Sequence, residues 1–252
     1  MQETGPRVLA IVAHPDDEAW CAGLLAAQVD AGFDVHLGVC CNGNLGGPPD
    51  WDPEQRAQVR REEMEQAAGI IGCHLHWLDV GDDVFMDRFQ GNYGALEWLV
   101  RDLIRATDPE LLILPAPDDY HHHHRAVCEL ALNASVNASN PALKSTLPAS
   151  SRVPLVLHMQ PVPPGPFVPD VYVDISATLE RKLAALQCHK SQHPFLQSHH
   201  KTDFMELVRT TARLHGTACE VAYAEAYALC RRWNRVATIQ QLAPFFPAPQ
   251  GA

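Results

Sequence analysis

Short apolar runs alternate with longer amphipathic segments along most of this 252-residue chain. Residues 8–13 and 111–115 are continuous apolar runs of strand length, which is typical of strands that are buried on both faces. Residues 54–71 instead carry apolar side chains at helical spacing. By the same criteria we predict strands at 33–41, 73–80, 153–160 and 171–175, and helices at 18–31, 94–107, 121–132, 176–189 and 203–215.

The repeated strand–helix order predicts an α/β fold with a mostly parallel sheet and helices on both of its faces. Neither an internal repeat nor a domain boundary is visible, so residues 1–243 are interpreted as a single domain. Asn, Ser and Pro are frequent in 135–150 and 161–170, which are predicted loops. Residues 244–252 are rich in proline and are predicted to form a loose C-terminal tail.

Polar residues follow the first predicted strand directly, at His14-Pro15-Asp16-Asp17-Glu18. Pro15 restricts His14 to extended conformations, so the strand must end in a turn there. One imidazole and two carboxylates then lie just beyond the carboxyl end of an inner strand, where open α/β sheets bind ligands. The alternative is that the acids only stabilise the first turn of a helix.

A second polar cluster follows the strand at 111–115 and contains four consecutive histidines, His121 to His124. Their position in mid-chain excludes an expression tag. On a helix that starts here, His121 and His124 are three residues apart and share a face, whereas His122 and His123 point elsewhere.

The two clusters together predict a metal site, because both follow carboxyl ends of inner strands. His14, Asp17 and His124 would form a set of two histidines and one aspartate with an open position for water, as in catalytic zinc sites. Asp16 remains free to act as general base on the metal-activated water. His121 faces the pocket and could hold a proton for the leaving group or support an oxyanion.

Composition narrows the classes of function. Thirty acidic against 19 basic residues give a formal net charge of −11, which argues against nucleic-acid and anionic-membrane partners. No apolar stretch approaches the roughly 20 residues that span a bilayer, and the N-terminus does not look like a signal peptide. The eight cysteines are scattered without a C-x-x-C pair, which favours reduced thiols and a cytoplasmic protein.

These motifs carry a family resemblance. Residues 13–18 read AHPDDE, the signature of the PIG-L/LmbE-like zinc deacetylases, and residues 119–126 resemble their second motif, D-x-H-P-D-H-x-A. The helix at 60–72 and the sequence YAEAY at 223–227 are also similar. The resemblance implies a Rossmann-like fold and hydrolysis of the N-acetyl group of an N-acetylglucosamine-type sugar, a small-molecule partner. The cofactor would be Zn²⁺, with Fe²⁺ as another candidate, and a homo-oligomer remains open.

By position, the resemblance implies zinc ligation by His14, Asp17 and His124. It implies that Asp16 is the general base and that His121 is the second acid–base or oxyanion residue. Arg60 matches an arginine that contacts the sugar. The alternative for Arg60 is an ion pair along its own helix, with Glu63 or Glu65.

The chain departs from the family motif at His122-His123, where the family has Pro-Asp. That aspartate orients the first histidine of the motif and raises its basicity, which His123 cannot do as an anion. One interpretation is that Asp118 or Asp119 takes its place in orienting His121. Otherwise the second motif has drifted, and the protein binds a metal or a sugar with weak or no deacetylase activity.

Other interpretations have less support. The glycine-rich segment 42–47 lacks the spacing of nucleotide-binding loops and is interpreted as a wall of the cleft. A single-metal site also lacks the bridging carboxylates of two-metal phosphoesterases. The alternation around His74 and His76 favours surface or packed histidines over a metal pair. We expect His158 to pack or to lie at a rim, and expect solvated side chains at His189, His193, His199 and His200.

Overall fold

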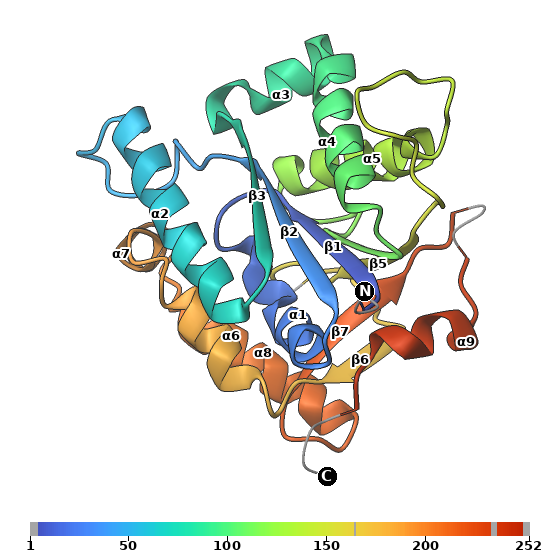
Figure 1. The fold of residues 1–252 in the computed structure, drawn as a ribbon. Coiled ribbons are helices and arrows are strands. Elements are labelled where there is room, and N and C mark those ends of the chain that lie inside the picture. Colours follow the sequence, from blue (N-terminus) through green and yellow to red (C-terminus); the bar gives the residue numbers. More distant parts are fainter. Residues whose placement is uncertain (1–4, 164, 233–235, 249–252) are drawn as a thin grey trace.

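A seven-stranded sheet runs through the centre of the computed structural model, which describes residues 5–163, 165–232 and 236–248 (Figure 1). Its strand order is β3-β2-β1-β4-β5-β7-β6. The strands are β1 Arg7–Val12, β2 Asp34–Cys41, β3 His74–Val80, β4 Leu111–Leu114, β5 Leu155–Met159, β6 Val171–Asp174 and β7 Ala224–Leu229. Strands β1 to β5 pair in parallel, and β7 runs antiparallel to both of its neighbours, β5 and β6. The predicted mostly parallel α/β sheet is therefore confirmed.

Helices cover both faces of the sheet, as its apolar strands require. Along β1, Val8, Ala10 and Val12 enter one core cluster, while Leu9 and Ile11 enter the other. The first face is covered by α1 Ala22–Asp30, α2 Pro53–Ile71, α6 Leu179–Leu186 and α8 Phe204–Ala218, and the second by α3 Asp82–Gly91, α4 Tyr93–Thr107 and α5 His122–Ala138. The other helices are η1 Asp17–Trp20, α7 Gln192–His199, α9 Ile239–Leu242 and η2 Ala243–Phe245.

Several boundaries differ from the sequence-based prediction. The helix predicted from residue 18 starts as the short 3-10 turn η1, and α1 begins only at Ala22. The helix predicted from residue 176 begins at Leu179 after the N-cap residue Thr178, and the Ser176 hydroxyl donates to Asp174 Oδ1 over 2.6 Å. Helices α3 and α7 were not predicted.

The start of the proline-rich C-terminal segment is packed rather than loose. Phe245 in η2 is buried in the core, and its carbonyl oxygen accepts a hydrogen bond of 2.9 Å from Gln28 Nε2. Residues 249–252 lie outside the described part of the chain. Among the described residues, no helix combines the length and the apolarity needed to cross a membrane.

The parallel register brings the carboxyl ends of β1, β2, β3 and β4 to one edge of the sheet. The segments that follow these strands include residues 13–20, 42–47 and 115–121. All polar clusters selected from the sequence therefore leave the sheet at the same edge.

Candidate metal centre

The turn after β1 has an unusual backbone. Asp16 adopts a left-handed conformation with φ 99°, which is uncommon for a non-glycine residue. Asp17 closes the turn, since its Oδ2 accepts from the His14 backbone N–H over 2.8 Å. The Asp16 side chain caps no backbone N–H of η1. Asp16 therefore does not act as a helix cap, which was the alternative interpretation of this turn.

His14, Asp17 and His124 come together as the sequence predicted. Asp17 Oδ2 lies 3.3 Å from His14 Nδ1 and 3.2 Å from His124 Nε2. Ligand atoms at tetrahedral angles around zinc lie about 3.3 Å apart, given bond lengths of about 2.0–2.1 Å. The three donor atoms thus have both the chemistry and the spacing of a zinc site, and they form one of the candidate metal groups among the described residues.

The side chains of this group shift one another's pKa values. Burial raises the pKa of Asp17, but the His124 and His14 side chains outweigh burial and hold this pKa well below its ordinary value. Burial likewise lowers the pKa of His124, yet the Asp17 charge and the hydrogen bonds to Asp119 and Asp17 raise it to about 10. Asp17 is therefore an anion, as a metal ligand must be.

Asp119 supports His124, a role that the sequence did not reveal. Its Oδ2 lies 3.0 Å from His124 Nδ1, which directs Nε2 of the same ring toward Asp17. A carboxylate behind a ligating histidine is a recurrent feature of metal sites. Asp119 does not orient the His121 ring, since Oδ1 accepts only the His121 backbone N–H. Asp118 lines a different cavity, so neither aspartate replaces the family aspartate at His121.

Asp16 and Arg60 form an ion pair beside the metal group. The Arg60 Nη2 atom lies 3.4 Å from Asp16 Oδ2 and also donates to the Pro15 carbonyl oxygen. Burial outweighs this cation and raises the pKa of Asp16 to about 6. The alternative of an ion pair along α2 is wrong, because Glu63 accepts from Ser191 and Glu65 pairs with Arg61.

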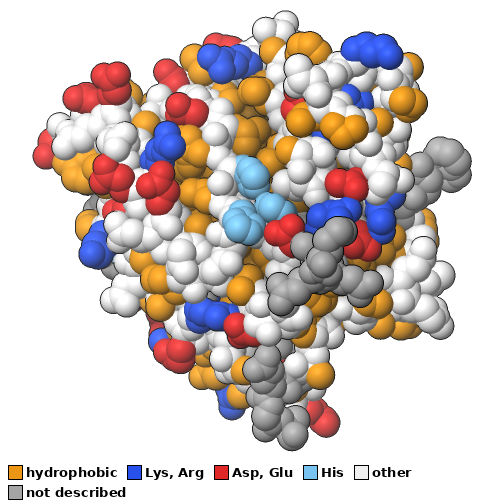
Figure 2. Space-filling view, in the orientation of Figure 1, with side chains coloured by type: hydrophobic (Ala, Val, Ile, Leu, Met, Phe, Trp, Pro, Cys, Tyr) orange, Lys and Arg blue, Asp and Glu red, His pale blue; other side chains and the backbone are white. Residues whose placement is uncertain are grey.

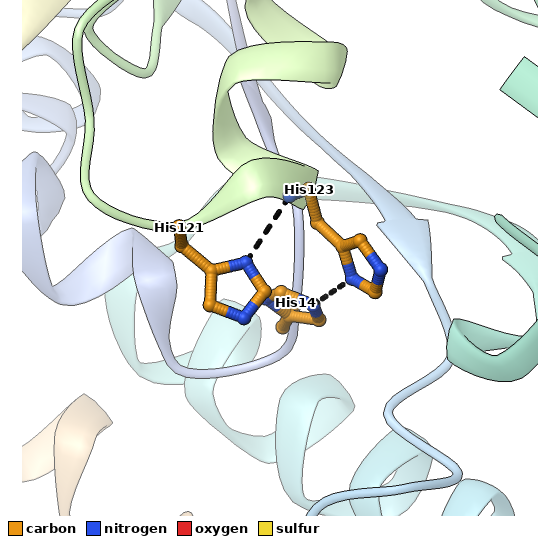
Figure 3. Close-up of side chains that lie close together, drawn as sticks. All are labelled: His14, His121 and His123. Carbon is orange, nitrogen blue, oxygen red and sulfur yellow. Dashed lines mark hydrogen bonds between the residues drawn. The ribbon is translucent and has the colours of Figure 1, made fainter. Parts of the chain in front are cut away.

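His121 and His123 lie differently from the helical projection. His121 has an extended backbone and is the N-cap of α5, where its Nδ1 accepts from the His123 backbone N–H over 3.2 Å. His123 was expected to point elsewhere, but its Nδ1 lies 2.9 Å from His14 Nε2 (Figure 3). The prediction of which histidines share a helix face failed because α5 begins at His122, one residue later than assumed. Burial, followed by the His14 ring, lowers the pKa of His121 to about 3 and that of His123 to about 4.

These residues line a cleft of about 520 Å³. Leu45 and Gly46 form part of its wall, as expected for the glycine-rich segment. The wall is fixed by Asp82, whose carboxylate accepts from the backbone N–H groups of Gly43 and Leu45. Asp82 follows β3 at the same sheet edge, which is the signal that would have identified it.

The other histidines are distributed as follows. His199 and His200 are exposed and line the cleft. His189 was predicted to be solvated, which is wrong: it is fully buried, and its Nε2 lies 2.6 Å from Glu18 Oε1, 171 residues earlier in the chain. The local sequence around His189 is polar and did not reveal this burial, because its partner Glu18 is so distant in the chain.

His158 is buried and lines a second cavity of about 690 Å³, in keeping with the expectation that it packs or lies at a rim.

His74 is exposed and His76 is half-buried, and both lie next to His36 of β2. Figure 2 shows histidine side chains gathered on one face of the molecule, in the region of β2 and β3. Within the described residues, every candidate metal group contains His14 instead.

Comparison with known proteins adds independent evidence. The family described as "PIG-L: GlcNAc-PI de-N-acetylase" matches residues 9–135. Diacetylchitobiose deacetylase of Thermococcus kodakarensis is 28% identical over 235 residues, which cover 87% of this chain and 81% of that protein. The 4-oxalmesaconate hydratase of Pseudomonas putida is 25% identical over 230 residues, 86% of each chain.

The fold is also similar to that of a solved relative. The crystal structure of a 4-carboxy-2-hydroxymuconate hydratase from Pseudomonas putida matches with a TM-score of 0.76 and 22% identity, over 92% of this chain and all of that one. The family match spans the turn after β1 and most of α5, which together supply the metal group, and it also includes the glycine-rich wall of the cleft. The protein belongs to the PIG-L family.

Proposed function

We propose that this protein is a metal-dependent hydrolase that removes the N-acetyl group from an N-acetylglucosamine-type sugar. The observation that carries the proposal is the position of Asp17 Oδ2, within 3.3 Å of nitrogens of both His14 and His124. Asp16 is adjacent and its carboxylate lines the same cleft. The similarity to a diacetylchitobiose deacetylase supports this choice of substrate class.

His14 Nδ1, Asp17 Oδ2 and His124 Nε2 would hold the metal. A bound zinc ion supplies Lewis acidity, which makes water more acidic and polarises an amide carbonyl. The mixed imidazole and carboxylate set also suits Fe²⁺. Asp119 keeps the His124 ring in the orientation that ligation needs.

Asp16 and His121, beside the metal group, would carry out the proton transfers. Asp16 takes a proton from water as the water oxygen bonds to the acetamide carbon. His121 accepts a backbone N–H at Nδ1, so the proton of its neutral ring is on Nε2, where it can be donated to the oxyanion. A proton then passes from Asp16 or His121 to the amide nitrogen as the C–N bond breaks. Acetate and a free amino sugar are the products.

Arg60 holds Asp16 in place. Its guanidinium is buried between Asp16, the Pro15 carbonyl and the Gly43 carbonyl. Because Arg60 also lines the cleft, we propose that its remaining surface contacts the sugar.

The test is acetate release from N,N'-diacetylchitobiose and related N-acetylglucosaminides by the metal-loaded protein. Replacing Asp16→Asn should lower kcat by roughly 10²–10⁴-fold, the range of general-base catalysis, while metal content stays the same. Asp118→Asn is the matched control, because that side chain lines the other cavity. Wild-type rates in Asp16→Asn would exclude Asp16 as the base.

A second candidate is a hydratase, which adds water to a carbon–carbon double bond. It is favoured by the similarity to 4-oxalmesaconate hydratase over 86% of each chain. The same Asp16 carboxylate would take the proton from water. Loss of ultraviolet absorbance from a conjugated unsaturated polycarboxylate, without acetate release from any N-acetyl sugar, would assign the protein to this second function.

A further inference from the structure

We propose that His14, His121 and His123 form a second metal position, made of three imidazoles, on the opposite edge of the His14 ring. The inference rests on the proposed metal centre, because it uses the same histidine. It concerns the position at which the chain departs from the family motif, His123.

The geometry of the three rings supports ligation. One ring nitrogen of each residue lies within 4.8 Å of the others. The ring centroids are 4.9 Å apart for His14–His121, 5.1 Å for His14–His123 and 5.0 Å for His121–His123, so the three rings form a nearly equilateral cluster (Figure 3). His14 Nε2 and His123 Nδ1 share a hydrogen bond of 2.9 Å. A bound zinc ion would replace the proton of this hydrogen bond and hold the two nitrogens about 3.3 Å apart.

The two metal groups use different atoms of His14. Its Nδ1 lies 3.3 Å from Asp17 Oδ2, whereas its Nε2 faces His123. His121 accepts the His123 backbone N–H at Nδ1, so the lone pair of its neutral ring is on that nitrogen. Ligation through Nδ1 would replace this hydrogen bond, while Nε2 keeps its proton. When both groups hold a metal, the His14 ring loses its last N–H proton to solvent.

The surroundings hold the His123 ring in place. Phe85 is fully buried and packs edge-on against it, with ring centroids 5.3 Å apart. His123 itself is 6% exposed. A set of three neutral imidazoles selects transition metals such as Zn²⁺, Co²⁺ and Cu²⁺ over Mg²⁺ and Ca²⁺, which prefer oxygen ligands.

Co²⁺ titration in a background without the first group tests the proposal. His124→Ala removes that group, and the variant should still bind Co²⁺, as measured by calorimetry and by the visible absorption of the ion. Adding His123→Ala should weaken binding by at least about 100-fold, since the loss of mere supporting groups already costs 10–100-fold. Adding His122→Ala instead is the matched control and should leave affinity unchanged.

Two further variants keep the result interpretable. Asp17→Asn provides a near-isosteric second background if His124→Ala fails to fold. His74→Ala with His76→Ala in every arm removes the surface histidines as competing sites. Unchanged Co²⁺ affinity on adding His123→Ala to both backgrounds would overturn the second position. The proposed function fails independently, if metal-loaded wild-type protein releases no acetate.

Discussion

Among single residues, Asp119 is the most informative position after the three proposed metal ligands. It is buried, and its Oδ2 lies 3.0 Å from His124 Nδ1. Asp119→Asn replaces this acceptor with an amide and removes the preference for a proton on Nδ1. We expect metal affinity to fall about 10–100-fold, the usual cost of losing such a partner. Calorimetric titration with Zn²⁺ measures it, with Asp118→Asn as control, and unchanged affinity would contradict the role.

The sequence was sufficient for residues whose position follows from strand ends, but not for those that depend on distant contacts. His14, Asp17 and His124 were predicted as one group because parallel strands end at one sheet edge. The orientation of His123 depended on the first residue of α5, and helix ends are the least certain part of such a prediction. The Glu18–His189 pair joins segments 171 residues apart, with no local signal.

At the scale of elements, the segment 42–47 must approach α2 closely. Gly43 has φ +76°, and a Cβ atom there would lie 2.7 Å from Arg60 Cδ. We expect Gly43→Ala to lower the free energy of unfolding by about 1–3 kcal/mol. An alanine there would have a strained left-handed backbone and would also collide with the Arg60 side chain. It should also displace Arg60 and lower activity.

Gly69→Ala is the control for this substitution, since Gly69 is exposed on α2 and a Cβ there meets nothing within 4 Å. It should raise stability by up to about 1 kcal/mol, the gain of alanine over glycine in a helix. Urea unfolding compares the two variants. Equal effects would show that the close approach of Gly43 to Arg60 does not matter.

Elements with strong apolar patterns were predicted correctly, and those with mixed patterns were missed. The inner strands β1 and β4 are buried on both faces and read as continuous apolar runs. The helix α7 buries only Gln192, so its sequence shows no apolar period. Strand β7 carries the buried Glu225 at its second position, which breaks the apolar run of an inner strand.

At the scale of the whole molecule, Glu225 joins the antiparallel part of the sheet to the helices beside the site. Its carboxylate accepts from the backbone N–H groups of Gly23 and Leu24 at the start of α1, over 2.8 and 2.9 Å. It also pairs with Lys182 of α6 over 2.7 Å and accepts from the Tyr227 hydroxyl. The buried charge is thus fully partnered, as its burial requires, and it fixes α1 behind the turn that holds Asp16 and Asp17.

The Glu18–His189 pair links η1, which begins in this turn, to the segment between α6 and α7, and it makes stability depend on pH. Burial lowers the pKa of His189, but the Glu18 carboxylate outweighs burial and raises this pKa above its ordinary value of 6.5. A raised pKa in the folded state means that the folded protein binds a proton more tightly than the unfolded chain. The stabilisation is therefore complete below about pH 6 and is lost as pH rises through the folded-state pKa.

We expect His189→Gln to lower the free energy of unfolding by about 1.5–3 kcal/mol below pH 6, the value of a hydrogen bond to a charged group. The difference from wild type should shrink as pH rises above 6.5, because the unfolded chain then releases the proton that the folded pair still holds. Urea unfolding at a series of pH values measures this difference. His74→Gln is the control, because that side chain is 71% exposed and should give a small difference at every pH. A His189→Gln difference that grows with pH would mean that this pair does not hold its proton in the folded protein.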